Sequence, residues 1–281
     1  MYISKLISIS LLLFIIHGNS ALAQEEFKDC EDCPFLITIN PGSMERQDNQ
    51  NGPNFTVNIE KPFAITKLEI TVKEFKLFIQ DSGYLVESGC TMFTTQGGQF
   101  NPAGSWENPK YKAKDDMPVA CVSIFDAEAY ASWISEKTGQ IYRLPSETEW
   151  QFTARSGNPN SSKWYTTGFM KTGDANCADC FGQDVMGRED LLQPLSVGGK
   201  ANSFGVVAIL GNVAEWTADC PGESFENAPT NNRARTDGDC NIRMARGGTF
   251  HHKWNELSSQ RNPYKIGIRR NDVGIRLVRE L

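Results

Sequence analysis

Two adjacent histidines near the C-terminal end offer the most versatile chemistry in this chain. His251 and His252 closely follow Thr249, and imidazole can bind iron, copper or zinc and can transfer protons near neutral pH. The pair is predicted to lie on a strand, where neighbouring side chains point to opposite faces, so one can enter a pocket while the other faces away. A metal other than copper could use His252 with Glu256 or His251. The alternative is that His252 is hydrogen-bonded to the backbone and binds no metal.

A second polar set with aromatic members lies in the last thirty residues. Guanidinium, amide and aromatic groups gathered on one face could hold a peptide or a glycan, and the alternative is a solvated loop that closes the domain. The candidate binding residues are Trp254, Arg261, Tyr264, Arg269 and Asn271.

The eight cysteines could form disulfides or bind a metal. If the chain is exported, an even number of cysteines favours disulfides, because the compartments outside the cytoplasm are oxidising. Eight cysteines allow on the order of a hundred pairings, among which spacing alone does not choose. A zinc site built from the two CxxC pairs is the competing interpretation, but Cys33 and Cys177 are 144 positions apart (177 minus 33), far from zinc-ribbon spacing. The predicted pairs are Cys30 with Cys33, Cys90 with Cys121, Cys177 with Cys180, and Cys220 with Cys240.

The N-terminal residues have the pattern of an export signal. Lys5 precedes an apolar run over residues 6–16, followed by small residues. The run is too short to span a bilayer, and the alanine spacing fits cleavage before Gln24. We therefore predict a signal peptide over residues 1–23, a mature single-domain chain over residues 24–281 without a membrane span, and a periplasmic or secreted location.

The charge balance argues against a nucleic-acid partner. The chain has 28 basic and 34 acidic residues, a formal net charge of −6, and removal of Lys5 with the signal makes it about −7. A mildly acidic chain without a basic run lacks the positive surface that nucleic-acid binding requires. We expect no nucleic acid among its partners.

Three helices are indicated by capping residues and by apolar residues at helical spacing. The first and third begin with a capping box, formed by Thr71 with Glu74 and by Ser146 with Glu149. Ser123 is the predicted cap of the second. The predicted helices run from Thr71 to Gly83, from about Ile124 to Lys137, and from Ser146 to near Gly157.

The rest of the chain favours short strands and loops. Residues 35–41 are predicted to form a strand that ends in a Pro-Gly turn, and residues 57–68 two more strands around Pro62. From Asn158 onward, Gly, Asn, Asp and Ser are frequent and long periodic segments are few. The simplest organisation is therefore one α+β domain.

Four short motifs occur in a fixed order, namely RLPSETEW (143–150), GNVAEW (211–216), RGGTF (246–250) and GIRLV (274–278). In these motifs the chain resembles the formylglycine-generating enzyme, or sulfatase-modifying factor, family, whose fold is a variant of the C-type lectin fold. The resemblance implies that fold here, with short strands, loops and a few helices.

The resemblance also shows where the chain departs from the active enzymes. Copper oxidases of the family carry two cysteines after the Gly-Gly pair, and here these places fall on His252 and Leu257. Thiolate sulfur selects Cu(I), so copper is an unlikely cofactor. Ala214 stands where active members usually carry Trp. Thr249 stands where the family usually has a Ser near the copper, so its hydroxyl could orient a ligand, or it could be an ordinary strand residue. His252 and Thr249 are the candidate catalytic residues.

The resemblance further implies calcium as a possible cofactor. In the family, the segment around GNVAEW supplies backbone carbonyls and a carboxylate, roles that would pass to Gly211, Val213 and Glu215. A second family site uses an Asn that resembles Asn176. Ala208 stands where the family has another ligand Asn. The alternative for Glu215 and Asn176 is a hydrogen-bonded loop carboxylate and a turn residue.

Two functions remain open at this stage. The first is an exported family member that binds a peptide, glycan or protein partner without copper-thiol oxidase chemistry. The alternative is a periplasmic non-copper oxidase or maturation enzyme resembling the pyoverdine-maturation branch of the family.

Overall fold

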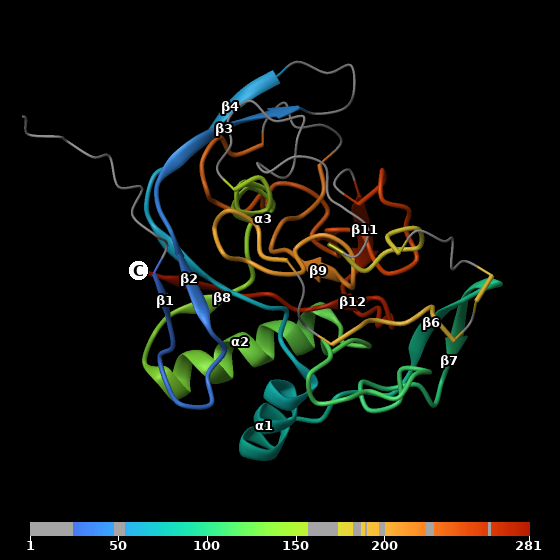
Figure 1. Ribbon diagram of the computed structural model, residues 1–281. Helices are drawn as coiled ribbons and strands as arrows, with labels where there is room; N and C mark the ends of the chain where they lie inside the picture. Colours follow the sequence, from blue (N-terminus) through green and yellow to red (C-terminus); the bar gives the residue numbers. More distant parts are fainter. Residues whose placement is uncertain are drawn as a thin grey trace, which may run out of the picture.

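The computed structural model describes residues 25–47, 54–156, 174–181, 187–188, 190–196, 200–222, 228–257 and 260–281. The predicted signal peptide lies outside these ranges. The described residues form short strands in two larger sheets and two hairpins, with three helices beside them (Figure 1). This architecture confirms the predicted α+β class.

The five-stranded sheet brings the two ends of the described chain together. Its order is β1-β2-β5-β13-β8, with every neighbouring pair antiparallel. The C-terminal strand β13 therefore lies in the interior of the sheet, between β5 and β8. The strands are β1 (Glu26–Phe27), β2 (Leu36–Ile39), β5 (Phe63–Thr66), β8 (Tyr142–Arg143) and β13 (Val278–Glu280).

The four-stranded sheet positions the C-terminal polar residues. Its order is β11-β10-β9-β12, antiparallel except for the parallel pair of β9 and β12. Two of the family motifs therefore lie side by side, since Glu215 of one pairs with Arg246 of the other. The strands are β9 (Ala214–Trp216), β10 (Ile242–Arg246), β11 (Arg261–Lys265) and β12 (Val273–Gly274).

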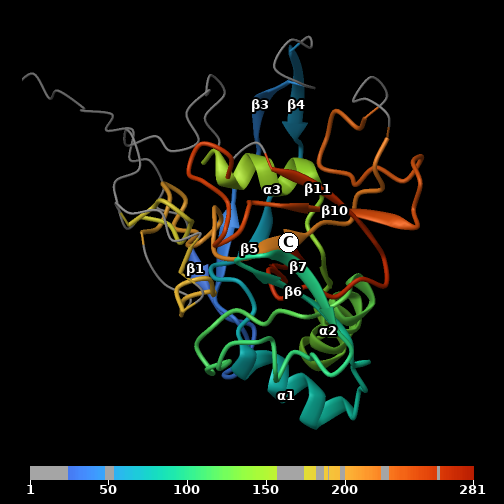
Figure 2. The ribbon, with the colours of Figure 1, turned by 90° about the vertical axis from the view of Figure 1, so that its right-hand side faces the viewer.

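Two hairpins extend from this framework. One consists of β3 (Gly42–Gln47) and β4 (Asn54–Ile59), and the other of β6 (Cys90–Thr94) and β7 (Gly97–Asn101). Both views place β3 and β4 at the end of the molecule opposite to α1 and α2 (Figures 1 and 2).

The helices begin where their caps predict. They are α1 (Val72–Ser82), α2 (Ile124–Thr138) and α3 (Glu147–Ala154), with Thr71, Ser123 and Ser146 as N-caps. Each N-cap side chain and the residue at N3 form a complete capping box, including Ser123 with Asp126. Gly83 and Gly139 end the first two helices in the left-handed conformation. The third ends at Arg155, before Gly157, which lies outside the described residues.

The core has two large parts. One packs α1, α2, β9 and β12 together and includes Trp216, and the other packs β3, β4, β5 and α3 and includes Trp150. Both tryptophans are fully buried, whereas Trp133 on α2 is partly buried against the first part. No helix in the described ranges has both the length and the apolar character that a bilayer span requires.

Candidate functional site

The two histidines lie in a turn, and the strand predicted for them is wrong. Strand β10 ends at Arg246 because Gly247 and Gly248 follow with φ of +104° and +70°, conformations that L-residues avoid. A Cβ on Gly248 would also lie only 2.7 Å from Cδ2 of Leu257. The chain therefore turns here, and the rings of His251 and His252 lie on the same side, with centroids 4.5 Å apart.

His252 is fixed by Thr249. The Thr249 backbone N–H donates to Nδ1 of His252 over 3.0 Å, and the Thr249 hydroxyl lies 2.9 Å from the same nitrogen. Burial, followed by the nearby His251, lowers the pKa of His252 to about 4. The ring is therefore neutral at pH 7, and since Nδ1 accepts a hydrogen bond, Nε2 carries its proton. The two candidate catalytic residues are thus in contact.

His251 forms a close pair with a buried carboxylate. Nε2 of His251 lies 2.6 Å from Oδ2 of Asp272, which also accepts hydrogen bonds of 2.8 and 2.7 Å from Arg270. Burial alone would raise the pKa of Asp272, but the contacts with His251 and Arg270 outweigh it and lower the pKa to about 2. Asp272 is therefore ionised under all physiological conditions.

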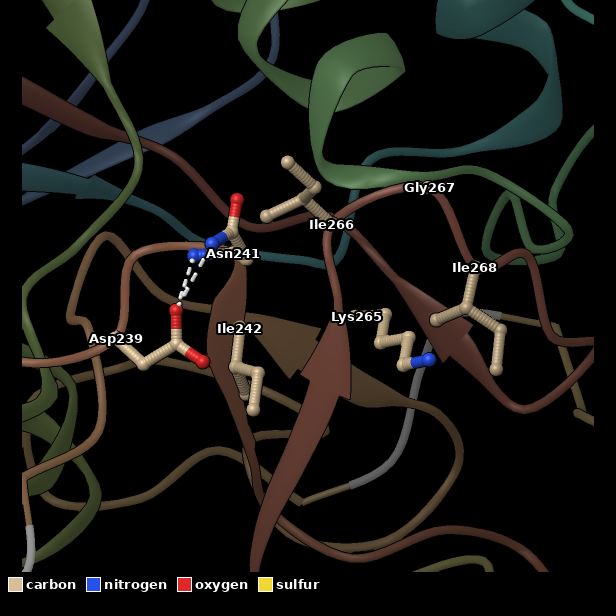
Figure 3. Close-up of a pocket in the computed structure, with 7 residues that line it drawn as sticks. All are labelled: Asp239, Asn241, Ile242, Lys265, Ile266, Gly267 and Ile268. Carbon is tan, nitrogen blue, oxygen red and sulfur yellow. Dashed lines mark hydrogen bonds between the residues drawn. The ribbon is translucent and has the colours of Figure 1, made fainter.

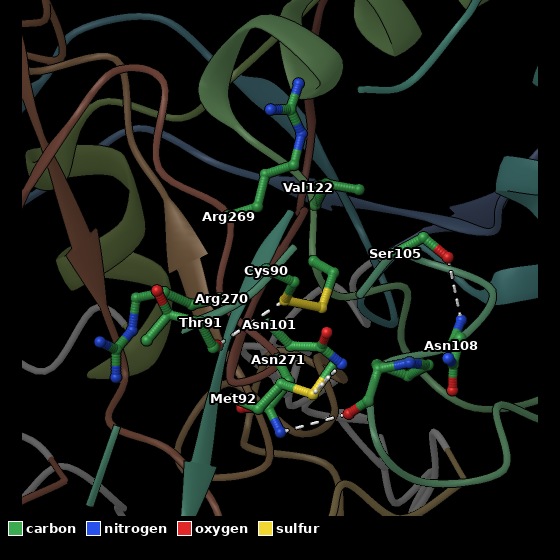
Figure 4. Close-up of a disulfide and its surroundings, with 12 residues drawn as sticks. Cys90, Thr91, Met92, Asn101, Ser105, Asn108, Val122, Arg269, Arg270 and Asn271 are labelled. Carbon is green, nitrogen blue, oxygen red and sulfur yellow. Dashed lines mark hydrogen bonds between the residues drawn. A yellow bond between two sulfur atoms is a disulfide. The ribbon is translucent and has the colours of Figure 1, made fainter. Parts of the chain in front are cut away.

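The hairpin β6–β7 covers His251. The ring of Phe93, on β6, stacks on His251 with centroids 3.4 Å apart and planes within 5°. Backbone hydrogen bonds join the same strand to the C-terminal segment, from Thr91 to the Arg269 carbonyl and from Asn271 to the Thr91 carbonyl. Figure 4 shows the Cys90–Cys121 disulfide between this strand and the segment before α2. The site is thus assembled from three distant parts of the chain.

The predicted binding residues fall into two groups. Arg269 and Asn271 have internal partners: Arg269 donates to Asp126 and Glu87, and Asn271 accepts from the Phe93 backbone and donates to Pro109. Arg269 is only 9% exposed and Asn271 only 1%. These two residues therefore hold the framework of the site together and expose little surface to a ligand.

The other predicted binding residues are partly exposed. Arg261 donates to the Glu147 carboxylate through Nε and Nη2, over 2.9 and 2.8 Å. The Arg270 guanidinium lies 4.9 Å from the centroid of the Tyr264 ring. Trp254 donates its backbone N–H to Asp179 and leaves part of its side chain accessible. Tyr264, Arg270 and Trp254 can therefore contact a ligand.

The two positions predicted to correspond to the copper thiols of the oxidases hold no sulfur. His252 occupies one, and Leu257, at the other, is fully buried in the core. The structure contains the four disulfides predicted from the sequence, and they account for all eight cysteines. A Cu(I) ion bound by two thiolates does not fit these residues.

The Glu215 carboxylate is already occupied by protein donors. Its Oε2 accepts from the Trp150 indole over 2.6 Å and its Oε1 from Arg276 over 2.8 Å, and both Glu215 and Arg276 are fully buried. A calcium ion here would meet the positive charge of Arg276, so these residues fit an ion pair and do not fit a calcium ligand set.

The other residues proposed for calcium lie in or beside the turn that precedes β9, with the carbonyls of Gly211 and Val213 as the predicted ligand atoms. Gly211 donates its N–H to the Gly247 carbonyl, and Val213 donates its N–H to Glu69. The Asn176 amide donates to Gln193 and Asn212, and its backbone carbonyl accepts from Asn212. Calcium stays a prediction, for which metal analysis of the purified protein is the test.

A separate cavity of about 600 Å³ lies at the other end of the β10–β11 pair (Figure 3). It is lined by apolar side chains that include Ile242, Ile266 and Ile268, with Lys265 and Asp239 beside them. Because Ile242 begins β10 while the histidine turn follows its last residue, this cavity is distinct from the histidine site.

Sequence reasoning did not find Phe93. It stands in a hairpin 158 positions before His251 (251 minus 93), and nothing in its local sequence points to the turn it covers. Arg270 and Asp272 carried a weak signal, since they belong to the polar C-terminal stretch from which the candidate binding residues were chosen.

Comparisons with known proteins identify the family to which this fold is related. Residues 22–281 match the family of sulfatase-modifying factor enzyme 1-like domains. The chain is 29% identical over 204 residues to the inactive C-alpha-formylglycine-generating enzyme 2 of Mus musculus, a match that covers 59% of this chain and 61% of the mouse protein. It is 26% identical over 208 residues to the formylglycine-generating enzyme of Mycobacterium tuberculosis, covering 60% and 67%.

The fold also resembles a solved structure over nearly its full length. PvdO from Pseudomonas aeruginosa superimposes with a TM-score of 0.76 and 28% identity, covering 92% of this chain and 99% of PvdO.

Proposed function

The chain belongs to the family of sulfatase-modifying factor enzyme 1-like domains, and we propose that it is an exported member that binds a peptide, glycan or protein partner without copper-thiol oxidation. One observation supports the absence of copper-thiol oxidation. Of the two places that hold copper thiols in the oxidases, one has an imidazole bound to Thr249 and the other a fully buried leucine. No free cysteine remains elsewhere to replace them.

The binding half of the proposal rests on the surface around the histidine turn. Phe93, Trp254 and Tyr264 present partly exposed aromatic rings, and Arg270 adds a cation beside Tyr264. The residues beneath them are fixed by ion pairs and hydrogen bonds, so little side-chain entropy would be lost on binding. Rigid aromatic residues with a nearby cation are the groups that dominate recognition of peptides and sugars.

The oxidase question can be answered with the mature, oxidised protein. We expect no aldehyde product when it is incubated with Cu(I), oxygen and a cysteine-containing substrate peptide, because the ion has no thiolate ligands. Copper-dependent conversion of the peptide would overturn the proposal.

Binding can be measured with a random phage-displayed peptide library and a glycan array as probes. Ligands selected on the wild-type protein should bind Trp254→Ala and Tyr264→Ala variants at least about tenfold more weakly, as expected when a contact aromatic is truncated. Phe125→Ala on α2, which is 49% exposed, is the matched control and should bind normally. Ligands that bind all variants equally would place the binding surface elsewhere.

A second candidate function is a non-copper oxidase or maturation enzyme. The contact between the His251 ring and the buried Asp272 carboxylate favours it, because an imidazole oriented by a carboxylate is a common arrangement in general acid–base catalysis. Stoichiometric iron or copper in the purified oxidised protein, lost in His252→Ala, would support this candidate and overturn pure binding. Absence of both a transition metal and oxygen uptake would eliminate the metal-dependent version.

A further inference from the structure

A turn beside the histidine segment brings two cysteine sulfurs and a carboxylate together. The ligand atoms of Cys177, Asp179 and Cys180 all lie within 4.8 Å of one another. Among the residues that the structure describes, no other group of three His, Cys, Asp or Glu side chains is this close. We propose that reduction of the Cys177–Cys180 disulfide converts this turn into a site for one Zn²⁺, bound by both thiolates and by Asp179. The proposed ligand binding does not depend on this site.

The first support comes from the size of the ring that the disulfide closes. Its cysteines are three positions apart, whereas those of Cys90–Cys121 and Cys220–Cys240 are 31 and 20 positions apart. A disulfide stabilises a fold mainly by restricting the unfolded chain, and this restriction grows with the length of the closed loop. Opening Cys177–Cys180 therefore costs the fold less than opening either long-range disulfide.

The second support is that the turn is held by other bonds. The Ala178 N–H donates to the His252 carbonyl over 2.8 Å, and the Cys180 N–H donates to the Cys177 carbonyl over 3.3 Å. Asp179 accepts the Trp254 N–H over 2.7 Å. These bonds do not involve sulfur, so the three ligand groups stay close together after the disulfide opens.

The third support is the position of the carboxylate. Oδ1 of Asp179 lies 3.3 Å from Sγ of Cys177. A disulfide sulfur has no proton to donate, so this contact is not a hydrogen bond, whereas a cation would bind both atoms. Two sulfurs on one tetrahedral zinc lie about 3.8 Å apart, given Zn–S bonds of about 2.3 Å. The two sulfurs are bonded to each other in the disulfide form, so they must move apart to this distance after reduction.

Exposure favours entry of an ion from one side. Asp179 is exposed, while Cys177 and Cys180 are 1% and 7% exposed. The ion would therefore reach the carboxylate first, and three protein ligands leave a fourth position for water or for a group of a partner.

The chemistry requires a dithiol as reductant. The dithiol transfers two electrons and two protons to the disulfide, which yields two thiols and an oxidised dithiol. Zn²⁺ then replaces the two thiol protons, which are released to solvent.

The test begins with graded reduction of the mature protein by dithiothreitol without oxygen, followed by alkylation and mapping of the modified cysteines. Cys177 and Cys180 should be alkylated while the two long-range disulfides remain closed and the circular dichroism is unchanged. After removal of the reductant, the protein should retain one equivalent of added ZnCl₂ through gel filtration. Co²⁺ should give a thiolate charge-transfer band.

Three variants define the ligands. Cys177→Ser/Cys180→Ser should bind no zinc, and Asp179→Asn, which keeps the acceptor for Trp254, should bind it at least about tenfold more weakly. Cys30→Ser/Cys33→Ser removes a disulfide of the same spacing at the other end of the chain and should bind zinc normally. Unfolding before Cys177 and Cys180 open, zinc retained by the Cys177/Cys180 variant, or no zinc retained by the wild type would each overturn the proposal.

Discussion

At the scale of single residues, the protonation of His252 is the most direct consequence of the site's geometry. Apart from His17, the chain has only two histidines, so their NMR signals can be assigned by one substitution. With its pKa lowered to about 4, His252 should remain neutral down to about pH 5. A titration midpoint near the usual value of about 6.5 would contradict the buried turn geometry.

The same shift predicts how stability depends on pH. Between about pH 6.5 and pH 4 the unfolded imidazole binds a proton while the folded one does not, so folding free energy is lost as the pH falls through this window. The full shift corresponds to about 3 kcal/mol, and solvent screening of a partly exposed ring reduces this to about 1–2 kcal/mol. Urea unfolding of His252→Gln, which cannot titrate, should show a shallower decline than the wild type over this range.

Residue type predicted the neighbourhood of the site better than the role of each residue in it. Arg269 and Asn271 were candidates for ligand contact because guanidinium and amide groups suit recognition. The same groups also form hydrogen bonds and ion pairs inside a protein. Burial favours this internal role here, since both side chains are almost fully covered. Thr249 and His252 were predicted independently, and their mutual contact arises from a turn that propensity does not reveal.

At the scale of elements, the start of α2 joins local capping to the framework of the site. Asp126 accepts from Ser123 as part of the capping box and also from Arg269 and Tyr84. Asp126→Ala should therefore destabilise the fold by about 3–5 kcal/mol, because it leaves the buried Arg269 guanidinium with only the exposed Glu87 as an ionic partner. Glu74→Ala in the capping box of α1, which has no arginine partner, should cost about 1 kcal/mol. Equal losses in chemical denaturation would contradict this account.

Ala208 is a strained position on the approach to β9. Its φ of +54° lies in the left-handed region, where an L-residue with a Cβ is disfavoured. Ala208→Gly should therefore stabilise the protein by about 0.5–1 kcal/mol, measured as a shift in the urea midpoint at constant slope. Ala129→Gly, in the interior of α2, is the control and should destabilise by about 1 kcal/mol. Destabilisation by both changes would show that the backbone at Ala208 is not strained.

Elements were predictable where their signals are local. Each helix start was readable because the N-cap and its partner lie three residues apart, as in Ser146 with Glu149. The strand predicted for the histidines failed because the Gly247–Gly248 pair was interpreted as part of a motif, while its backbone conformation is what ends β10. Periodicity over a few residues does not detect such a turn.

At the scale of the whole molecule, the site depends on contacts between distant parts of the chain. Phe93 reaches His251 only because β6 is hydrogen-bonded to the segment from Arg269 to Asn271. No local sequence pattern indicates that pairing. The family resemblance therefore predicted the fold, whereas the contact between Phe93 and His251 became visible only in the structure. The order of the motifs predicted the fold because the motifs lie on neighbouring strands, as the pairing of Glu215 with Arg246 shows.

The Cys90–Cys121 disulfide should therefore affect both stability and the site. It closes a loop across 31 positions, and its removal should lower the free energy of unfolding by about 4 kcal/mol, against about 2 kcal/mol for Cys30–Cys33. Because Cys90 begins the strand that carries Phe93, Cys90→Ala/Cys121→Ala should also loosen the aromatic stack. The ring-current shift of the His251 signal should then fall in this variant and persist in Cys30→Ala/Cys33→Ala. An unchanged His251 signal in both would mean that the backbone pairing alone holds the hairpin over the site.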